Sequence, residues 1–575
     1  MSLTEIAMAR QPGGGDSQAQ GRAPVEPAAS EACRLLCAGV HLDGGYRDAV
    51  LDELYLHEER FVAPSTGIDA ARVLAHALRA RRTELGWAVG MLALWISAVP
   101  LTSGLFLLLV PPCVLLALAP WITGRSPRAP WYRKAAGFLV LWYGRFLLAG
   151  VLVSLVLLGF SGEDPPSEVE LVSEGGSLVP GLSGGLDSFA EPGRAWAALI
   201  LFLLIMVGVG LRRGQFARVM TNELSARRFP EVSSDPAELA SGARYQRLRA
   251  RIRAEQHAPL VMYHSANPFR GVGEPFRPWT LAVELRPRKD RKPVPVDNGE
   301  ILRRIVPLLE ALRVPSPHGS PEAADAVRDR LRELRVDECV FLPVDGLTRR
   351  DGAPYDDASF GPHRDGSVEE GGEARRHFLR IRVGGWHEEL VVTVFVRVHT
   401  QGGMLMLEVA PHVLMPVRPQ FREADRVAHR YLNNSFIGKA AWALAHAPES
   451  MGQALLALVR YLVSAWELLT GGQAGALPDG PAVSVRELGS DSEASLFQEM
   501  DVSRYLKSVE DRVAGGVRLA LYEAGWQTAE FEQKIVNVAN GGVFIETAQD
   551  SAIGIGDHNS VSNRNEGAGS SNGRD

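Results

Sequence analysis

Residues 85–124 read LGWAVGMLALWISAVPLTSGLFLLLVPPCVLLALAPWITG and contain no charged side chain over 40 positions. As one helix this stretch would be roughly 60 Å long at about 1.5 Å per residue, about twice the thickness of the hydrocarbon layer of a bilayer. Two shorter helices, joined by a turn at residues 100–104, would each have the length of one crossing. The stretch therefore predicts a membrane hairpin with spans at about 85–101 and 104–122.

Two further apolar stretches, 137–160 and 195–211, bring the predicted transmembrane region, residues 84–212, to four helices. Basic residues near a span are retained on the cytoplasmic side. They cluster before the first span, between the second and third, and after the fourth: Arg72, Arg79, Arg81 and Arg82; Arg125, Arg128, Arg133 and Lys134; Arg212, Arg213 and Arg218. We therefore expect a multi-pass protein of the cell membrane with both termini in the cytoplasm and the acidic segment 161–194 outside.

The composition excludes several classes of protein. Lysine and arginine number 61 against 67 acidic residues, and the net charge of −6 gives no general electrostatic reason to bind nucleic acid. The four cysteines, Cys33, Cys37, Cys113 and Cys339, are too scattered for a disulfide framework, and their spacing is not that of a zinc site. We expect no metal and no cofactor.

The soluble parts divide by composition. Residues 1–30 are rich in Gly, Pro and Ala and predict a disordered tail, whereas 31–83 predict a short helical cytosolic segment. Residues 213–258 form a connector whose arginine-rich helix, 238–257, either stands in solvent or meets anionic headgroups. A cytosolic α+β domain at 259–470, with helices at 298–312 and 321–334, precedes a linker and an amphipathic helix within 471–533.

Alternating β-branched residues from His377 onward predict an antiparallel β meander. One face of this sheet carries Arg380, Arg382 and Arg397, which makes it a candidate face for an anionic ligand. A solvated face or a face covered by a helix is the simpler alternative.

The helix expected at 451–469 is nearly long enough to span a membrane, but Arg460 lies in its middle. A fifth crossing would also place the C-terminus outside, without basic residues to justify that side. We therefore expect this helix on the inner membrane surface or in the core of the domain.

No catalytic centre is expected. The chain has no Gly-x-Ser-x-Gly elbow, and Gly271-Val272-Gly273 is followed by a strand instead of the helix that a phosphate-binding loop requires. A hairpin or a bulged loop is the alternative for these glycines.

The segment 534–561 combines alternating β-branched residues, Asn and Gly with little charge, which favours stacking of identical copies. Its end resembles the RHIM amyloid-signalling core at Ile553, Ile555, Gly556, Asn559 and Val561, although Gly554 stands where that motif has Gln. The resemblance implies self-assembly, or recruitment of a protein with a matching motif. An inert Gly/Asn-rich terminus or a β-arch is the alternative, and 562–575 are expected to be disordered.

The order of spans, domain and tail resembles a group of uncharacterised membrane proteins from actinobacteria, which carries no known activity. Together these observations predict a non-enzymatic multi-pass membrane protein, of a signalling or defence-associated kind, whose partners are the bilayer and further copies of itself or a protein with a matching motif. The alternative is a membrane-anchored ligand-binding or scaffold protein with an inert tail.

We expect a peptide of residues 534–565 to form thioflavin-positive fibrils. The change Ile555→Pro should abolish them, because proline removes a ladder donor in every copy of the stack. A proline placed within 562–575 should have no effect. A peptide that stays monomeric at high concentration over days would refute the motif.

Overall fold

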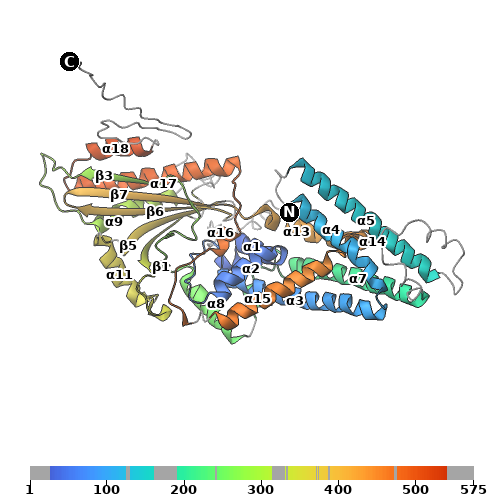
Figure 1. Cartoon of the computed structure of the whole chain (residues 1–575). Helices are drawn as coiled ribbons and strands as arrows, with labels where there is room; N and C mark the ends of the chain where they lie inside the picture. The colour runs from blue at the N-terminus through green and yellow to red at the C-terminus, as the bar shows by residue number, and fades with distance from the viewer. Residues whose placement is uncertain are drawn as a thin grey trace, which may run out of the picture.

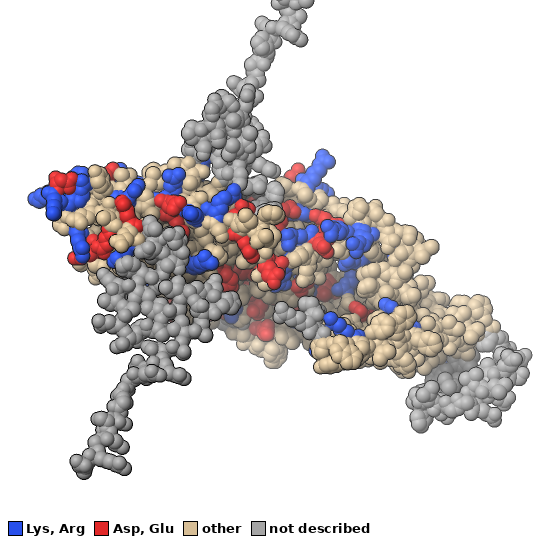
Figure 2. Space-filling view, turned by 90° about the horizontal axis from the view of Figure 1, so that it is seen from above, with Lys and Arg blue, Asp and Glu red and all other residues tan. Residues whose placement is uncertain are grey.

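The computed structural model describes residues 26–124, 130–160, 191–239, 242–313, 331, 334–355, 357–370, 372, 375–385, 389–471 and 475–539. The molecule has three parts in a row (Figure 1): a β domain at one end, a base of short helices in the middle and a bundle of long apolar helices at the other end. Charged side chains gather over the β domain and the base, whereas the far end of the bundle is almost free of them (Figure 2).

Within the described residues, five helices are long and apolar enough to cross a membrane. They are α3 (Ala70–Leu101), the pair η3 (Leu105–Leu109) and α4 (Val110–Thr123), α5 (Trp131–Phe160), α7 (Pro192–Asn222) and α15 (Ser450–Thr470). The four stretches predicted as spans fall within the first four of these. The predicted number of four differs from the five found, because α15 also meets the length and composition of a span.

The hairpin in the stretch 85–124 turns where it was expected. Ser103 and Gly104 adopt positive φ angles of 49° and 92°, and Thr102 accepts the backbone N–H of Phe106 with its side-chain oxygen. Trp95 packs edge-on against Phe106 at 5.2 Å between ring centroids. This contact ties the two arms together below the turn.

The base forms around the ends of α3 and α7 that extend beyond their apolar stretches. Its other elements are η1 (Pro27–Ala29), α1 (Glu31–Leu42), α2 (Gly44–Leu51), η2 (Asp52–Leu56), η5 (Val232–Ser234), α8 (Ala243–Glu255), α12 (Pro419–Arg422), α13 (Ala424–Leu432) and α16 (Val485–Leu488). One hydrophobic core joins these elements except η1 and η5, and it contains Leu36, Leu74, Met220, Ile252 and Phe421. Segment 31–83 therefore shares its core with residues several hundred positions away.

The β domain contains a mixed seven-stranded sheet in the described part of the chain, with strands in the order β1-β4-β5-β6-β7-β2 and β3 also on β7. The strands are β1 (Leu260–Tyr263), β2 (Glu274–Pro275), β3 (Trp279–Glu284), β4 (Arg335–Pro343), β5 (Arg376–Gly385), β6 (Leu390–Gln401) and β7 (Met404–Leu414). The α+β character and the antiparallel meander β5-β6-β7 are confirmed. The sheet is mixed because β1 pairs with β4 in parallel.

Three helices cover one face of the sheet (Figure 1): α9 (Asn298–Glu310), α17 (Leu496–Glu523) and α18 (Ala529–Ala539). Ile305, Val509 and Phe531 pack there against alternate residues of the strands, such as Val394 and Leu407. The remaining elements are η6 (Ala311–Arg313), η7 (Arg350–Gly352), α11 (Asp357–Glu369) and α14 (Phe436–His446).

The opposite face is crossed by the loop 264–273, because this loop joins β1 at one edge of the sheet to β2 at the other. Phe269 lies on that face, with its ring 5.3 Å from Phe341 of β4, 5.7 Å from Phe378 of β5, 4.9 Å from Phe395 of β6 and 4.6 Å from His412 of β7. These four rings lie on four successive strands of the sheet, β4 to β7. One aromatic side chain thus contacts four neighbouring strands.

The Gly271-Val272-Gly273 segment ends this crossing loop. The backbone N–H groups of Gly271 and Gly273 both donate to Oε1 of Glu487, at 2.8 and 3.0 Å. A carboxylate of the same chain thus occupies the site that resembled a phosphate-binding loop. The prediction that these glycines form a hairpin or a bulged loop, and not a phosphate-binding loop, agrees with this contact, which also fastens the β domain to α16 of the base.

Several predicted boundaries need correction. Residues 26–30 belong to the fold, because Ser30 caps α1 and Ala28 is buried, so the predicted tail 1–30 is too long. The β-prone segment 534–561 begins as a helix, since α18 continues to Ala539 with Ile535 packed against the core of the β domain. Residues 540–575, the acidic segment 161–190 and most of the helix predicted at 321–334 lie outside the described residues.

We expect Gly273→Ala to destabilise the protein more than Gly346→Ala. Both glycines have a φ of 93°, so both changes introduce the same backbone strain of about 1–2 kcal/mol. A Cβ at Gly273 would also collide with the carbonyl oxygen of Val413, whereas one at Gly346 would meet open space. The midpoint of thermal unfolding of the full chain in detergent measures the difference, and equal midpoints would contradict the packing described for the crossing loop.

Candidate functional site

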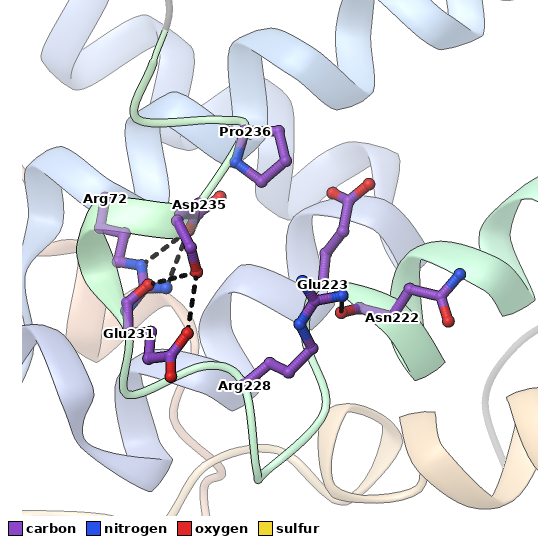
Figure 3. A pocket seen from close by; sticks show the side chains of 8 residues that line it. Arg72, Asn222, Glu223, Arg228, Glu231, Asp235 and Pro236 are labelled. Atoms are coloured by element: carbon purple, nitrogen blue, oxygen red, sulfur yellow. Dashed lines mark hydrogen bonds and ion pairs between the residues drawn. The ribbon is translucent and has the colours of Figure 1, made fainter.

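A buried ionic network holds the base together (Figure 3). Arg72 of α3 donates from Nε and Nη2 to Oδ2 of Asp235, at 2.9 and 2.8 Å, and Figure 3 shows these two side chains facing each other. His76, which Figure 3 does not draw, places its Nε2 atom 3.0 Å from the same oxygen. The side chains of Arg72, His76 and Asp235 are 1%, 0% and 3% exposed. Arg72 and His76 face the same way because they lie four residues apart on one helix.

The surroundings of Asp235 stabilise its charged form. Burial alone raises the pKa of a carboxyl, but the contact with His76, the backbone N–H of Ala237 and the charge of Arg72 outweigh it. The pKa of Asp235 therefore lies well below its ordinary value. Arg72 also donates to the carbonyl of Ala28 at 2.6 Å and stacks 3.6 Å from the centre of the Phe229 ring.

The hollow beside this network is small. It has a volume of about 40 Å³ and is lined by Arg72, Asn222, Glu223, Arg228, Glu231, Ser234, Asp235 and Pro236 (Figure 3). Such a volume holds little more than water. The network therefore fixes the loop 223–238 onto α3, and we assign it a structural role.

Two histidines in contact with each other lie between this network and a larger cavity: His76 belongs to the network, and His41 lines the cavity. The rings of His76 and His41 meet edge to face with 5.8 Å between their centroids. His41 Nε2 and His76 Nδ1 are buried and have no hydrogen-bond partner among the described residues. Burial, together with the charges of His76, Arg79 and Arg47, lowers the pKa of His41 to about 3. The neutral imidazole of His41 is therefore the favoured form in this buried position.

We call the larger cavity the junction pocket, because it lies where the base meets the apolar helices. Its volume is about 150 Å³. It is lined by His41, Leu42, Gly44, Arg47, Arg79, Ala80, Thr83, Glu84, Trp87, Arg212, Gln215, Phe216 and Val219. Trp87 donates from Nε1 to Oε1 of Gln215 at 2.6 Å, which joins α3 to α7 at the rim.

Positive charge exceeds negative charge around the junction pocket. Arg79 pairs with Glu223 at 2.6 Å, while Arg47 and Arg212 share Glu84. Arg47 and Arg460 also share Asp48, each at 3.7 Å. Asp48 and Arg460 lie outside the lining of the pocket. The three lining guanidinium groups, of Arg47, Arg79 and Arg212, thus meet two carboxylates, Glu84 and Glu223, and one positive charge is left in excess.

The donors that converge on the junction pocket suit a tetrahedral oxyanion. Guanidinium groups bind phosphate oxygens through two parallel N–H donors, and those of Arg47, Arg79 and Arg212 come from three different helices. Among the described residues, no group of three or more His, Cys, Asp or Glu side chains is arranged to hold a metal ion.

The arginines predicted for an anionic-ligand face do lie on one face of the sheet, but two of them already have carboxylate partners. Arg380 donates to both oxygens of Asp337, at 2.7 and 2.9 Å, and Arg397 lies 3.7 Å from Glu408. Each carboxylate lies directly opposite its arginine on the adjacent strand. Arg382 lies beside them on β5 and is partly buried. On the sheet, Arg380 and Arg397 each have a carboxylate of their own, whereas at the junction pocket Arg47 and Arg212 share one carboxylate, Glu84, so the pocket has the larger excess of positive charge.

The other predicted site lies outside the described residues: Ile553, Ile555, Gly556, Asn559 and Val561. The junction pocket was missed at the level of the sequence. In the sequence, Arg79 and Arg212 were used only to predict which side of the membrane is cytoplasmic. Their position next to the ends of two spans is the one signal that could have indicated a site.

Residues 278–552 match the family model described as AbeC-like domain. The match runs from β3 through the meander, α14, α15 and α17 to α18, and includes neither the junction pocket's helices α2, α3 and α7 nor β1. No curated protein and no solved structure matches the chain.

We expect Asp235→Asn to lower the free energy of unfolding at pH 7 by about 3–5 kcal/mol, because it leaves the buried guanidinium group of Arg72 without a countercharge. The folded-state pKa of Asp235 is depressed, so its contribution exists above the ordinary carboxyl pKa near 3.9 and disappears as the pH falls toward the folded value. The difference from wild type should therefore shrink below about pH 4.

The matched control is Asp290→Asn, which changes an exposed aspartate that also pairs with an arginine, Arg288. It should leave the midpoint of thermal unfolding in detergent nearly unchanged. Equal effects of the two changes, or a pH-independent loss for Asp235→Asn, would contradict the role given to the network.

Proposed function

We propose that the protein is a membrane-anchored binding protein without a catalytic role, and that its junction pocket binds the phosphate group of an anionic phospholipid. The observation that carries this proposal is the convergence of Arg47, Arg79 and Arg212 on one cavity with an excess of positive charge. A phosphodiester would neutralise that excess.

The position of the junction pocket along the helices supports a lipid as the source of the phosphate. The uncharged stretch of α3 begins at Leu85, and that of α7 ends at Leu211. The pocket is lined by Glu84, Trp87 and Arg212, which flank these limits. Headgroups occupy this level in a bilayer, and indole rings favour it.

Self-association through the C-terminal segment is a second proposal, carried by the sequence pattern at 553–561. In it the anchored protein clusters, or recruits a partner with a matching motif, and so passes a signal along the membrane. The two proposals concern different parts of the chain, so either can fail without the other.

We expect the full-length protein to retain phosphatidylglycerol in preference to phosphatidylcholine, as measured by native mass spectrometry from mixed-lipid nanodiscs. The double change Arg79→Gln and Arg212→Gln should weaken this retention at least tenfold, because hydrogen bonds to a charged group contribute about 1.5–3 kcal/mol each. The control is Arg303→Gln with Arg304→Gln on the exposed side of α9, which should retain the lipid as wild type does.

A calorimetric titration of glycerol phosphate into protein in phosphatidylcholine nanodiscs separates the two sources of phosphate. Binding of glycerol phosphate without retention of phosphatidylglycerol would overturn the lipid assignment in favour of a soluble anion. Equal retention of both lipids, or no loss in the double variant, would overturn the site.

A further inference from the structure

The helices α14 and α15 form a hairpin whose tip lies beside the middle of the uncharged part of α3, residues 85–101. Trp95 donates from Nε1 to Oγ of Ser450 at 3.3 Å. Ala447 and Ala454 belong to the same core cluster as Trp95. Trp95 lies ten residues beyond Leu85, where the uncharged stretch begins, which corresponds to about 15 Å along a helix or half of the hydrocarbon layer.

Both ends of this hairpin return to the base. Before α14, Tyr431 donates to the carbonyl of Gly210 at 2.7 Å, next to the charged end of α7. Along α15, Arg460 pairs with Asp48 of α2, and Arg81 lies 5.0 Å from the centre of the Tyr461 ring. Helix α15 therefore runs antiparallel to α3, from the level of Trp95 back to that of Arg81.

A crossing by α15 is incompatible with the β domain. The sheet and α9 precede α15 in the chain, whereas α17 and α18 follow it. Val509 and Val513 of α17 nevertheless share one core with Ile305 of α9 and Val394 of β6. If α15 crossed the bilayer, the two halves of this core would lie on opposite sides.

We propose that α14 and α15 form a re-entrant hairpin, which dips into the leaflet facing the β domain and does not cross the membrane. Much of the surface of the hairpin fits acyl chains, while the carboxylate of Glu449 at the tip accepts a hydrogen bond from the side-chain amide of Gln453 at 3.2 Å. Ser450, Ala454 and Ala457, which share one side of α15, are its buried residues and face α3. Phe436, Ile437, Leu444, Leu455 and Leu456 are exposed and apolar.

Polar groups at the tip of the hairpin have hydrogen-bond partners within the protein, as a position inside the membrane requires. Ser450 donates to the carbonyl of Ala447 at 2.6 Å, and the N–H of Ala447 donates to Ala443 at 2.8 Å. Turns at membrane depth are tolerated where their polar groups have such partners and are packed against protein. Pro448 lacks an N–H, so it adds no donor that would need one.

Spin labels on single introduced cysteines test the depth of the hairpin in the full-length protein in nanodiscs. The native cysteines Cys33, Cys37, Cys113 and Cys339 are buried, so labelling reports the introduced site. A label at Leu455→Cys should collide with oxygen more often than with a nickel chelate, as one at Leu203→Cys in the middle of α7 should. The aqueous control is Leu519→Cys on α17, where the chelate should collide more often.

Impermeant maleimide added to one side of sealed proteoliposomes tests the topology. Asn434→Cys, just before α14, and Gly475→Cys, just after α15, should react from the same side, together with Leu519→Cys. Reaction of Asn434→Cys and Gly475→Cys from opposite sides would show a crossing and overturn the proposal. A chelate-accessible label at Leu455→Cys would overturn it equally, since the tip would then lie in water.

Discussion

The helices α3 and α7 each run without interruption from the base into the apolar bundle, and this continuity fixes how the base and the bundle are placed relative to each other. Each helix is apolar along one half and packed into the base along the other, and it passes through the junction as one continuous α-helix. The first polar turns of α3 therefore have to be buried together with their charges. Arg72 and His76 are kept in that core by one carboxylate, Asp235, which arrives from a loop more than 150 residues away. Position and orientation of the base are thereby coupled to the apolar bundle.

Much of the architecture follows from periodicity in the sequence. Long uncharged runs gave the helices of the bundle, and alternation of β-branched residues gave the meander β5-β6-β7. Both signals are local, because a span must be long and apolar and a half-buried strand must alternate. The helix α15 shows the limit of this reasoning. Its composition allows a span, a surface helix or a core helix, and only its contacts with Trp95, Asp48 and Arg81 distinguish a hairpin from these.

The site was not predictable in the same way, because it is built from residues that are distant in the chain. Arg47, Arg79 and Arg212 belong to three helices, and no spacing in the sequence relates them. The same holds for the amide groups of Gly271 and Gly273, whose partner is Glu487. Conversely, Arg380 and Arg397 looked free in the sequence, since the strands that supply Asp337 and Glu408 could be identified but not paired in register.

The crossing loop has a consequence for where this protein can be divided. The family match begins at residue 278, after β1 and after Phe269. A fragment that starts there would lose the parallel partner of β4 and leave the backbone groups of that strand unpaired at an edge, which invites association with other edges. It would also uncover the rings of Phe341, Phe378 and Phe395. The unit recognised by sequence similarity and the unit that folds are therefore different pieces of this chain.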